Sequence, residues 1–292
     1  MIEGINIRCN VGGVEVLRSP RIVLTLRRRA VVSTCEVDIP DADGSVQVSL
    51  AKKQAVRVRF GHRGEGGTWH DWSGTVKDFQ PAGPDTIRVQ AVGLEQALID
   101  TTVTEAMHGE PADVVARRLL VSTGLPVAGI TIPAETFPHI VFSNVTVARA
   151  IKQLAASLER SFGHDLSRHA VWLGEAGLYW SDGDEPGAAF VVETAANLIR
   201  NDPNPAGMSY AVSTVLPGLT HSRRVRIRDT RRDFSELVRA EEVIHTLGAN
   251  GNTTTIGYGY DGGWGEWPNK VCFPCSSAPW NWPCRTCGPT TA

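Results

Sequence analysis

Apolar and polar positions alternate along the first third of the chain, with turn-forming glycines between the runs. Alternation with a period of two is typical of strands that bury one face. The runs are residues 14–17, 22–26, 46–50 and 56–60, followed by a hairpin of residues 72–79 and 86–92. Several short strands with regular turns predict a small β-barrel over residues 1–95.

The hydrophobic period becomes helical between residues 96 and 190. Pro111 is suited to the first position of one helix, and Thr146 is a candidate N-cap of a second. Four apolar residues after Thr146 recur at spacings of four, three and four, which places them on one helical face: Val147, Ile151, Leu154 and Leu158. Gly163 is the candidate C-cap, and residues 170–180 read as a hairpin. This stretch is predicted to be an α+β unit.

Strand patterns return over residues 191–260, with candidate strands at 225–227, 236–244 and 253–258. The last 32 residues, 261–292, hold four of the eight Trp and four of the six Cys, so we treat them as a separate segment. The predicted fold class is α+β, mainly β. Two small β-barrels, 1–95 and 191–260, flank an α/β insertion, 96–190, and a short Cys-rich C-terminal tail follows.

Charge and hydropathy exclude several classes of function. Lys and Arg total 29 and Asp and Glu total 31, a net charge of −2, so the chain is not a general binder of polyanions. No apolar stretch reaches the roughly 20 residues that a membrane span needs. The first residues lack the basic start and apolar core of a secretory signal. We therefore expect no membrane span, and folding in a cytoplasm.

Motifs of known catalytic classes are missing from the sequence, including phosphate loops, HExxH and GxSxG. Asp182 and Asp184 are a possible carboxylate pair, but the glycine between them favours a turn. His164, Asp165 and His169 could suggest metal ligands, although their spacing suits one helix face poorly. The sequence therefore supports no catalytic site, and we expect the protein not to be an enzyme.

Arginines gather in two places, residues 27–29 and residues 223–232, where six Arg stand against one Asp. In the second cluster Arg224, Arg226 and Arg228 alternate with apolar residues, which puts the three on one face of a strand. A solvated strand face, a contact between subunits and a surface along a channel all remain open. DNA readout is less favoured, because no aromatic interleaving accompanies these arginines.

The order of elements resembles the tail hub proteins of bacteriophages, the late control protein D and baseplate hub family. The resemblance covers about residues 10–260. It rests on residues 72–76, 87–98, 110–125, 146–154, 215–218 and 240–255. It implies two similar barrels around an α/β insertion, and three copies forming a ring of six barrels between the tail tube and a central spike.

From this resemblance we expect a structural baseplate hub of the virion tail, assembled in the host cytoplasm, that takes part in host attachment and DNA injection. The implied partners are two further copies, the tail tube protein, the spike protein and other baseplate proteins. Viral DNA would pass through the channel without sequence-specific binding. The alternative from a different class is a cell-wall hydrolase or nuclease with a zinc-ribbon-like tail, which predicts a cleft with a perturbed carboxylate or a metal site.

Four cysteines of the tail are spaced C-x2-C-x8-C-x2-C: Cys272, Cys275, Cys284 and Cys287. Two close pairs can supply four thiolates to zinc or to an iron–sulfur cluster. Iron–sulfur clusters in some phage tail-tip hubs favour that option by resemblance alone. Disulfides are the alternative, because a virion is extracellular and the tail has little core. We expect the C-terminal tail to form a compact knob that closes or rigidifies the hub near the spike. Cys9 and Cys35 are expected to be buried thiols or, less favoured, a disulfide.

Overall fold

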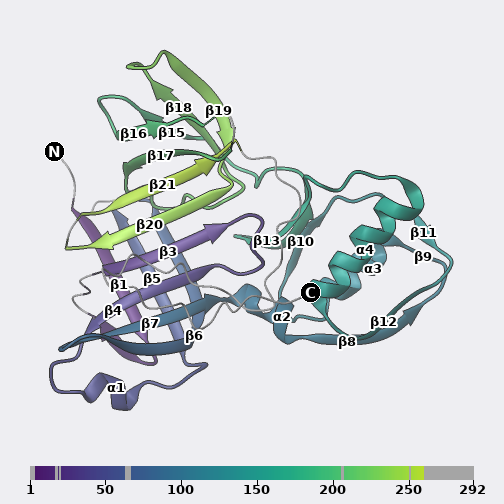
Figure 1. Cartoon of the computed structure of the whole chain (residues 1–292), viewed down its shortest axis with the longest axis horizontal. Helices are drawn as coiled ribbons and strands as arrows, with labels where there is room; N and C mark the ends of the chain where they lie inside the picture. The colour runs from purple at the N-terminus through teal and green to yellow at the C-terminus, as the bar shows by residue number, and fades with distance from the viewer. Residues whose placement is uncertain are drawn as a thin grey trace.

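The chain has a mainly β structure with one α+β unit beside a large sheet, as the computed structural model shows (Figure 1). The structure describes residues 4–16, 19, 21–62, 67–204, 207–249 and 251–259. The predicted fold class, α+β and mainly β, is confirmed. No helix in these described ranges combines the length and apolar character that crossing a membrane would require.

Eleven strands form one sheet. In chain order they are β1 (Ile5–Val11), β2 (Val14–Val16), β3 (Arg21–Arg27), β4 (Thr34–Pro40), β5 (Ala55–His62), β6 (Trp69–Gly83), β7 (Thr86–Gly93), β16 (Leu198–Asp202), β17 (Ser209–Thr214), β20 (Glu242–Gly248) and β21 (Thr253–Tyr258). The spatial order is β16-β17-β21-β20-β3-β4-β7-β6-β5-β1-β2, and every neighbouring pair is antiparallel.

Strands from both strand-rich segments are joined within this sheet. Strand β20 pairs with β3, with His245 opposite Leu24. The rings of His245 and His70 lie 5.0 Å apart, although β3, β4 and β7 stand between β20 and β6 in the sheet. The sheet therefore curls, and both segments contribute to one hydrophobic core. The division into barrels at 1–95 and 191–260 stays a prediction.

A second, three-stranded sheet covers part of this core. It consists of β15 (Phe190–Glu193), β18 (Arg224–Asp229) and β19 (Phe234–Arg239), with β15 parallel and β19 antiparallel to β18. Val192, Val225 and Ile227 are fully buried in the core of the large sheet. The alternation in β18 thus buries the aliphatic face and turns the arginines outward, as the sequence predicts.

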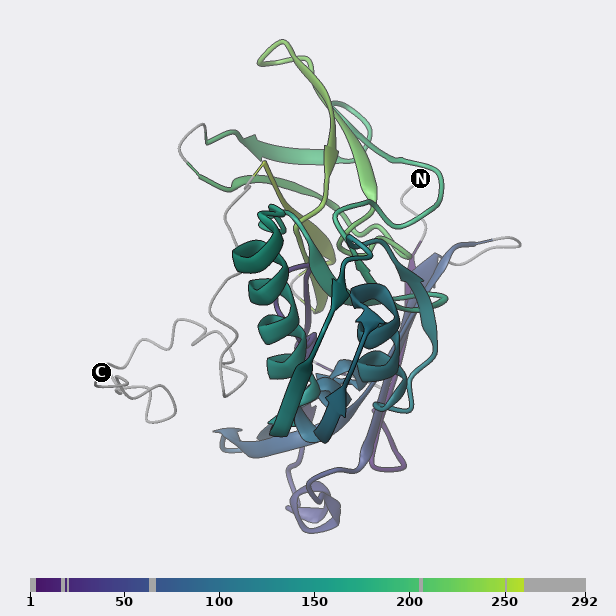
Figure 2. The ribbon, with the colours of Figure 1, turned by 90° about the vertical axis from the view of Figure 1, so that its right-hand side faces the viewer.

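The insertion has its own hydrophobic core beneath two helices, which Figure 2 shows side by side. Its helices are η1 (Leu94–Gln96), α2 (Ala97–Asp100), α3 (Ala112–Val121) and α4 (Val147–Phe162). Its strands are β8 (Thr102–Met107), β9 (Glu110–Pro111), β10 (Val127–Ile130), β11 (Thr136–Phe137), β12 (Ile140–Thr146), β13 (Ala170–Gly174) and β14 (Gly177–Ser181). The predicted caps of α4 are confirmed: the Thr146 side chain accepts the Arg149 amide, and Gly163 has a φ of 76°.

Two strand predictions are wrong. Residues 46–49 belong to a short helix, α1 (Ser45–Ser49), because the Asp41 carboxylate accepts the amides of Val46 and Gln47 and holds a helical turn there. The expected strand 236–244 is split between β19 and β20. The backbone around Glu241 leaves β18 and turns to the large sheet, where the Glu241 amide donates to the carbonyl of Gly257.

Candidate functional site

The outward face of β18 carries the three arginines that the sequence singled out. Arg224 forms an ion pair with Asp184 at 2.6 Å, and Arg228 pairs with Glu193 at 3.3 Å. Arg226, between them, is half-buried and has no ion pair within the described part of the chain. The central guanidinium is therefore available to a partner, while its neighbours are held in place by carboxylates.

Two apolar side chains flank Arg226 across the small sheet. The strand register places Val191 of β15 and Leu237 of β19 directly beside Arg226. Val191 is 44% exposed and Leu237 is 42% exposed. We call Val191, Arg224, Arg226, Arg228 and Leu237 the arginine face. A half-buried arginine between exposed aliphatic groups is typical of protein–protein contacts, where Arg is enriched.

The first arginine cluster has a different role, because Arg28 is fully buried where the large sheet meets the insertion. Its guanidinium donates to the Ser222 hydroxyl at 2.7 Å and to the carbonyl of Ser181 at 2.9 Å. It also lies over the ring of Trp172, 4.1 Å from the centroid. Burial, followed by the charge of Arg239, lowers the pKa of Arg28 to about 10, so the group stays charged at neutral pH. Arg28 thus links the large sheet to the insertion.

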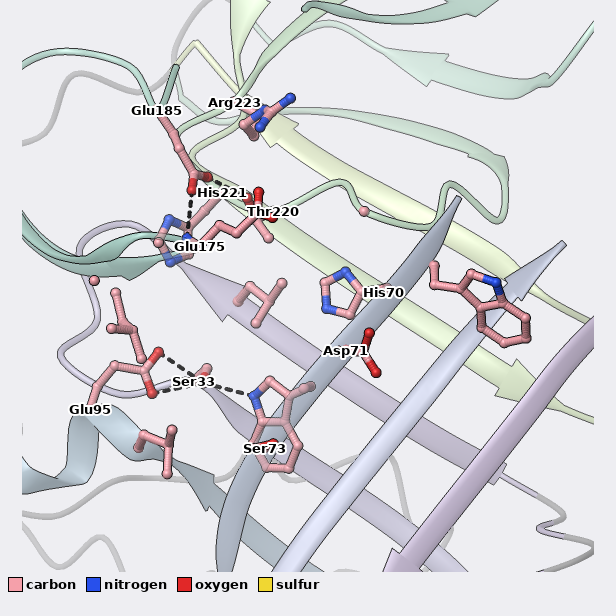
Figure 3. A pocket seen from close by; sticks show the side chains of 18 of the residues that line it. Ser33, His70, Asp71, Ser73, Glu95, Glu175, Glu185, Thr220, His221 and Arg223 are labelled. Carbon is pink, nitrogen blue, oxygen red and sulfur yellow. Dashed lines mark hydrogen bonds between the residues drawn. The ribbon is translucent and has the colours of Figure 1, made fainter. Parts of the chain in front are cut away.

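A cleft of about 640 Å³ lies between the large sheet, the small sheet and the insertion (Figure 3). At one end of the view, the Ser33 hydroxyl donates to the carboxylate of Glu95, and Trp72 Nε1 donates to the Ser33 oxygen at 3.0 Å. At the other end, Glu185 accepts from the hydroxyl of Thr220 at 2.8 Å. The cleft is thus lined by internal hydrogen bonds between segments distant in sequence.

The alternative function, a hydrolase or nuclease, predicts a carboxylate with a perturbed pKa in a cleft, and Glu95 has this property. Burial raises its pKa to about 7, and the hydrogen bond from Ser33 offsets this rise only in part. The other buried carboxylate, Glu185, accepts both the Thr220 hydroxyl and the amide of Glu175, at 2.9 Å. Both carboxylates thus form hydrogen bonds to segments that are distant in sequence. Sequence reasoning did not single out Glu95, since its burial depends on the packing of η1 against the sheet.

Three buried histidines lie near or inside the curled sheet. Burial lowers the pKa of His221 to about 3 and of His245 to about 4, and places that of His70 well below its usual value. His245 Nε2 lies 2.9 Å from the carbonyl oxygen of Leu219, and the His70 ring stacks on Phe60 with centroids 4.9 Å apart. These histidines are neutral core residues at pH 7, and no motif in the sequence marks them.

The other predicted site residues are scattered. His164 contacts Glu135 and His169 contacts the carbonyl of Thr131, and no group of three or more metal-ligating side chains occurs within the described ranges. Asp184 forms an ion pair with Arg224, while Asp182 and Gly183 lie in a bend after β14. The cysteines Cys272, Cys275, Cys284 and Cys287 lie outside the described residues. Cys9 and Cys35 are buried free thiols, and burial raises the pKa of Cys9 to about 12.

Comparison with known proteins identifies the fold. No family model matches the chain, and no curated protein matches it. Among solved structures, the 43 kDa tail protein of prophage MuSo2 from Shewanella oneidensis has a TM-score of 0.63 at 12% identity, covering 88% of this chain and 97% of that one. This chain has the fold of phage tail proteins.

Two further solved structures support the same fold. The tail protein from Neisseria meningitidis MC58 has a TM-score of 0.61 at 13% identity. The match covers 89% of this chain and 98% of the Neisseria chain. The E. coli c3393 protein, described as a type VI secretion component with structural similarity to phage T4 tail proteins gp27 and gp5, has a TM-score of 0.59 at 9% identity. It covers 89% of this chain and 78% of that one. The resemblance to phage tail proteins is confirmed at the level of fold.

Proposed function

We propose that this protein is a structural hub of a phage tail or of a phage-derived injection machine. One observation carries the proposal: the structural match to each of two tail proteins covers most of this chain and almost the whole of the tail protein. A tail protein of this kind acts through extended surfaces. The hydrogen bonds that occupy the carboxylates of the cleft fit such a role.

In this proposal, three copies form a ring that joins the tail tube to the central spike, alongside other baseplate proteins. Viral DNA passes through the ring without sequence-specific contacts, and the assembled virion uses the hub in host attachment and injection. Support comes from the curled sheet, to which both strand-rich segments contribute. It comes also from the E. coli neighbour, which is described as similar to two T4 tail proteins.

The arginine face is the proposed subunit contact. Arg226 has exposed aliphatic neighbours on both sides, and the ion pairs of Arg224 and Arg228 order the flanking side chains. Burying this face against a neighbour would desolvate the Arg226 guanidinium, so the partner surface has to supply a carboxylate or carbonyl acceptor.

Imaging of tail particles by electron cryo-microscopy, with this chain traced in the map, tests the assembly. We expect three copies around the tail axis between tube and spike. A particle that lacks the chain, or holds it in another symmetry, would refute the proposal. Free subunits can fail to assemble by themselves, so the particle is the sample to use.

Charge reversal tests the interface itself. Arg226→Glu should reduce the yield of complete tails, because the new carboxylate would face the partner's acceptor. The matched control is Arg57→Glu on β5, an exposed arginine with no ion pair in the described residues. Equal yields of complete tails from the two variants would show that the arginine face is not the subunit contact. The hub proposal itself would still be tested by the imaging experiment.

The C-terminal cysteines remain part of the proposal. Cys272, Cys275, Cys284 and Cys287 would hold zinc or an iron–sulfur cluster, or pair as disulfides, in a knob near the spike. Metal analysis with visible absorption on the purified protein separates these cases. Finding neither zinc nor iron, together with no free thiols in the tail, would assign the four cysteines to disulfides.

A further inference from the structure

Two histidines face each other at one end of the insertion, where two short strand ladders meet. Strands β8 and β12 pair Met107 with Ile140, and strands β9 and β11 pair Glu110 with Phe137. The two ladders keep the same register. His108 and His139, which lie between them, are therefore directly opposite each other, as in a cross-strand pair.

The ring geometry brings the two Nδ1 atoms to 3.0 Å, with centroids 4.4 Å apart and an interplanar angle of 43°. Zinc–nitrogen bonds of about 2.0–2.1 Å place adjacent ligand atoms about 3 Å apart around one ion. The imidazole nitrogens thus already have the separation of two ligands of a single metal. We propose that His108 and His139 form a two-imidazole binding site for a divalent transition-metal cation.

The backbone holds this pair in position. Gly109 has a φ of 64°, and its amide donates to the carbonyl of Phe137 at 3.0 Å. Both histidines are exposed, so a hydrated cation can reach them. No third metal-ligating side chain joins them within the described residues, and water completes the coordination sphere.

Binding needs only a change of tautomer. The Nδ1 contact of the free pair requires one ring to carry its proton on Nδ1 and the other to accept there. With a cation bound, both rings carry the proton on Nε2 and present the Nδ1 lone pair. Imidazole ligands favour zinc, copper and nickel over magnesium and calcium, which sets the chemical class of the ion.

Nickel(II) is the probe, titrated calorimetrically into the full chain and into the variant His139→Gln. Because two linked ligands bind more tightly than one, we expect the variant to lose one nickel site per chain or about 100-fold in affinity for it. In NMR spectra of the wild type, the ring signals of His108 and His139 should broaden first. Magnesium at the same concentrations should produce neither effect.

His62→Gln is the matched control, since His62 lies on β5 in the large sheet rather than in the insertion. It should bind nickel as the wild type does. The proposal would be overturned if His139→Gln bound nickel with the same isotherm as the wild type. It would also be overturned if His62→Gln lost as much nickel affinity as His139→Gln, or if magnesium competed equally for the site. The cysteines of the tail are the same in all three proteins, so any metal they bind cancels in the comparison.

Discussion

Buried ionisable side chains give this protein opposing responses to pH. Glu95 is held in its neutral form up to about pH 7, whereas His221 and His245 stay neutral down to about pH 3 and 4. In each case the main cause is burial, which disfavours the charged form. Rising pH and falling pH therefore destabilise the fold through different residues.

Glu95→Gln tests the response to rising pH. The pKa of Glu95 is raised from 4.5 to about 7 on folding, so the folded state holds a proton that the unfolded state loses. This contribution to stability is present below pH 4.5 and is lost as the pH rises through 7. Between pH 5 and 8 the variant should gain up to about 3 kcal/mol in unfolding free energy relative to wild type. Denaturant melts at both pH values measure this, and a difference that does not change with pH would contradict it.

His245→Gln tests the acidic side. The pKa of His245 is lowered from 6.5 to about 4 on folding, so the unfolded state binds the proton more readily. The wild-type contribution is full above pH 6.5 and is lost as the pH falls toward 4, by about 3 kcal/mol. The variant should show a shallower loss of stability over this range. Matching acid profiles of wild type and His245→Gln would refute the assignment.

At the scale of elements, α4 organises the insertion. Its apolar stripe, which includes Ile151, Leu154 and Leu158, is fully buried in the core of the insertion. Its start is set by the Thr146 hydroxyl and its end by Gly163 in the left-handed region. Local signals and packing agree in this helix, which is why the sequence pattern located it well.

Removing the cap should weaken this helix measurably. Thr146→Ala leaves the Arg149 amide without its side-chain acceptor and should lower the unfolding free energy by about 1 kcal/mol. Thr146→Ser keeps the hydroxyl and should stay close to wild type. Urea denaturation of the three proteins measures the difference, and equal losses from both substitutions would show that the methyl group, not the cap, matters.

At the scale of the whole molecule, two hydrophobic cores meet at a polar junction. Arg28 crosses this junction from the turn after β3, and its contacts to Ser181 and Ser222 join three segments that are far apart in sequence. Arg29 adds a hydrogen bond to the carbonyl of Ser167 at 3.1 Å. The relative placement of sheet and insertion thus depends on a few buried polar contacts.

Arg28→Ala should therefore destabilise the junction. It leaves the Ser222 hydroxyl and the Ser181 carbonyl without their partner and removes the group over Trp172, at a cost of about 2–4 kcal/mol. Faster proteolysis between the sheet and the insertion should accompany this loss. Arg57→Ala, at an exposed position on β5, is the control and should change stability by less than about 0.5 kcal/mol. Wild-type stability of Arg28→Ala would refute the role of the junction.

The sequence alone determined the features that depend on neighbours along the chain: the caps of α4, the hairpin of β13 and β14, and the outward arginines of β18. These follow from periodicity and from backbone preferences that act within a few residues. Its order of elements also led to the resemblance that the fold comparison confirmed.

Only the tertiary structure decided the features that depend on partners far away in the chain. The strand expected at 236–244 breaks at Glu241 because its two halves pair with different sheets. Arg28 and Arg29 turn inward because the insertion packs over them, whereas Arg27 stays exposed. The perturbed Glu95 and the facing pair of His108 and His139 exist because strands distant in sequence come into register or contact. A pattern of local spacing carries no information about such long-range pairing, since the same alternation suits many partners.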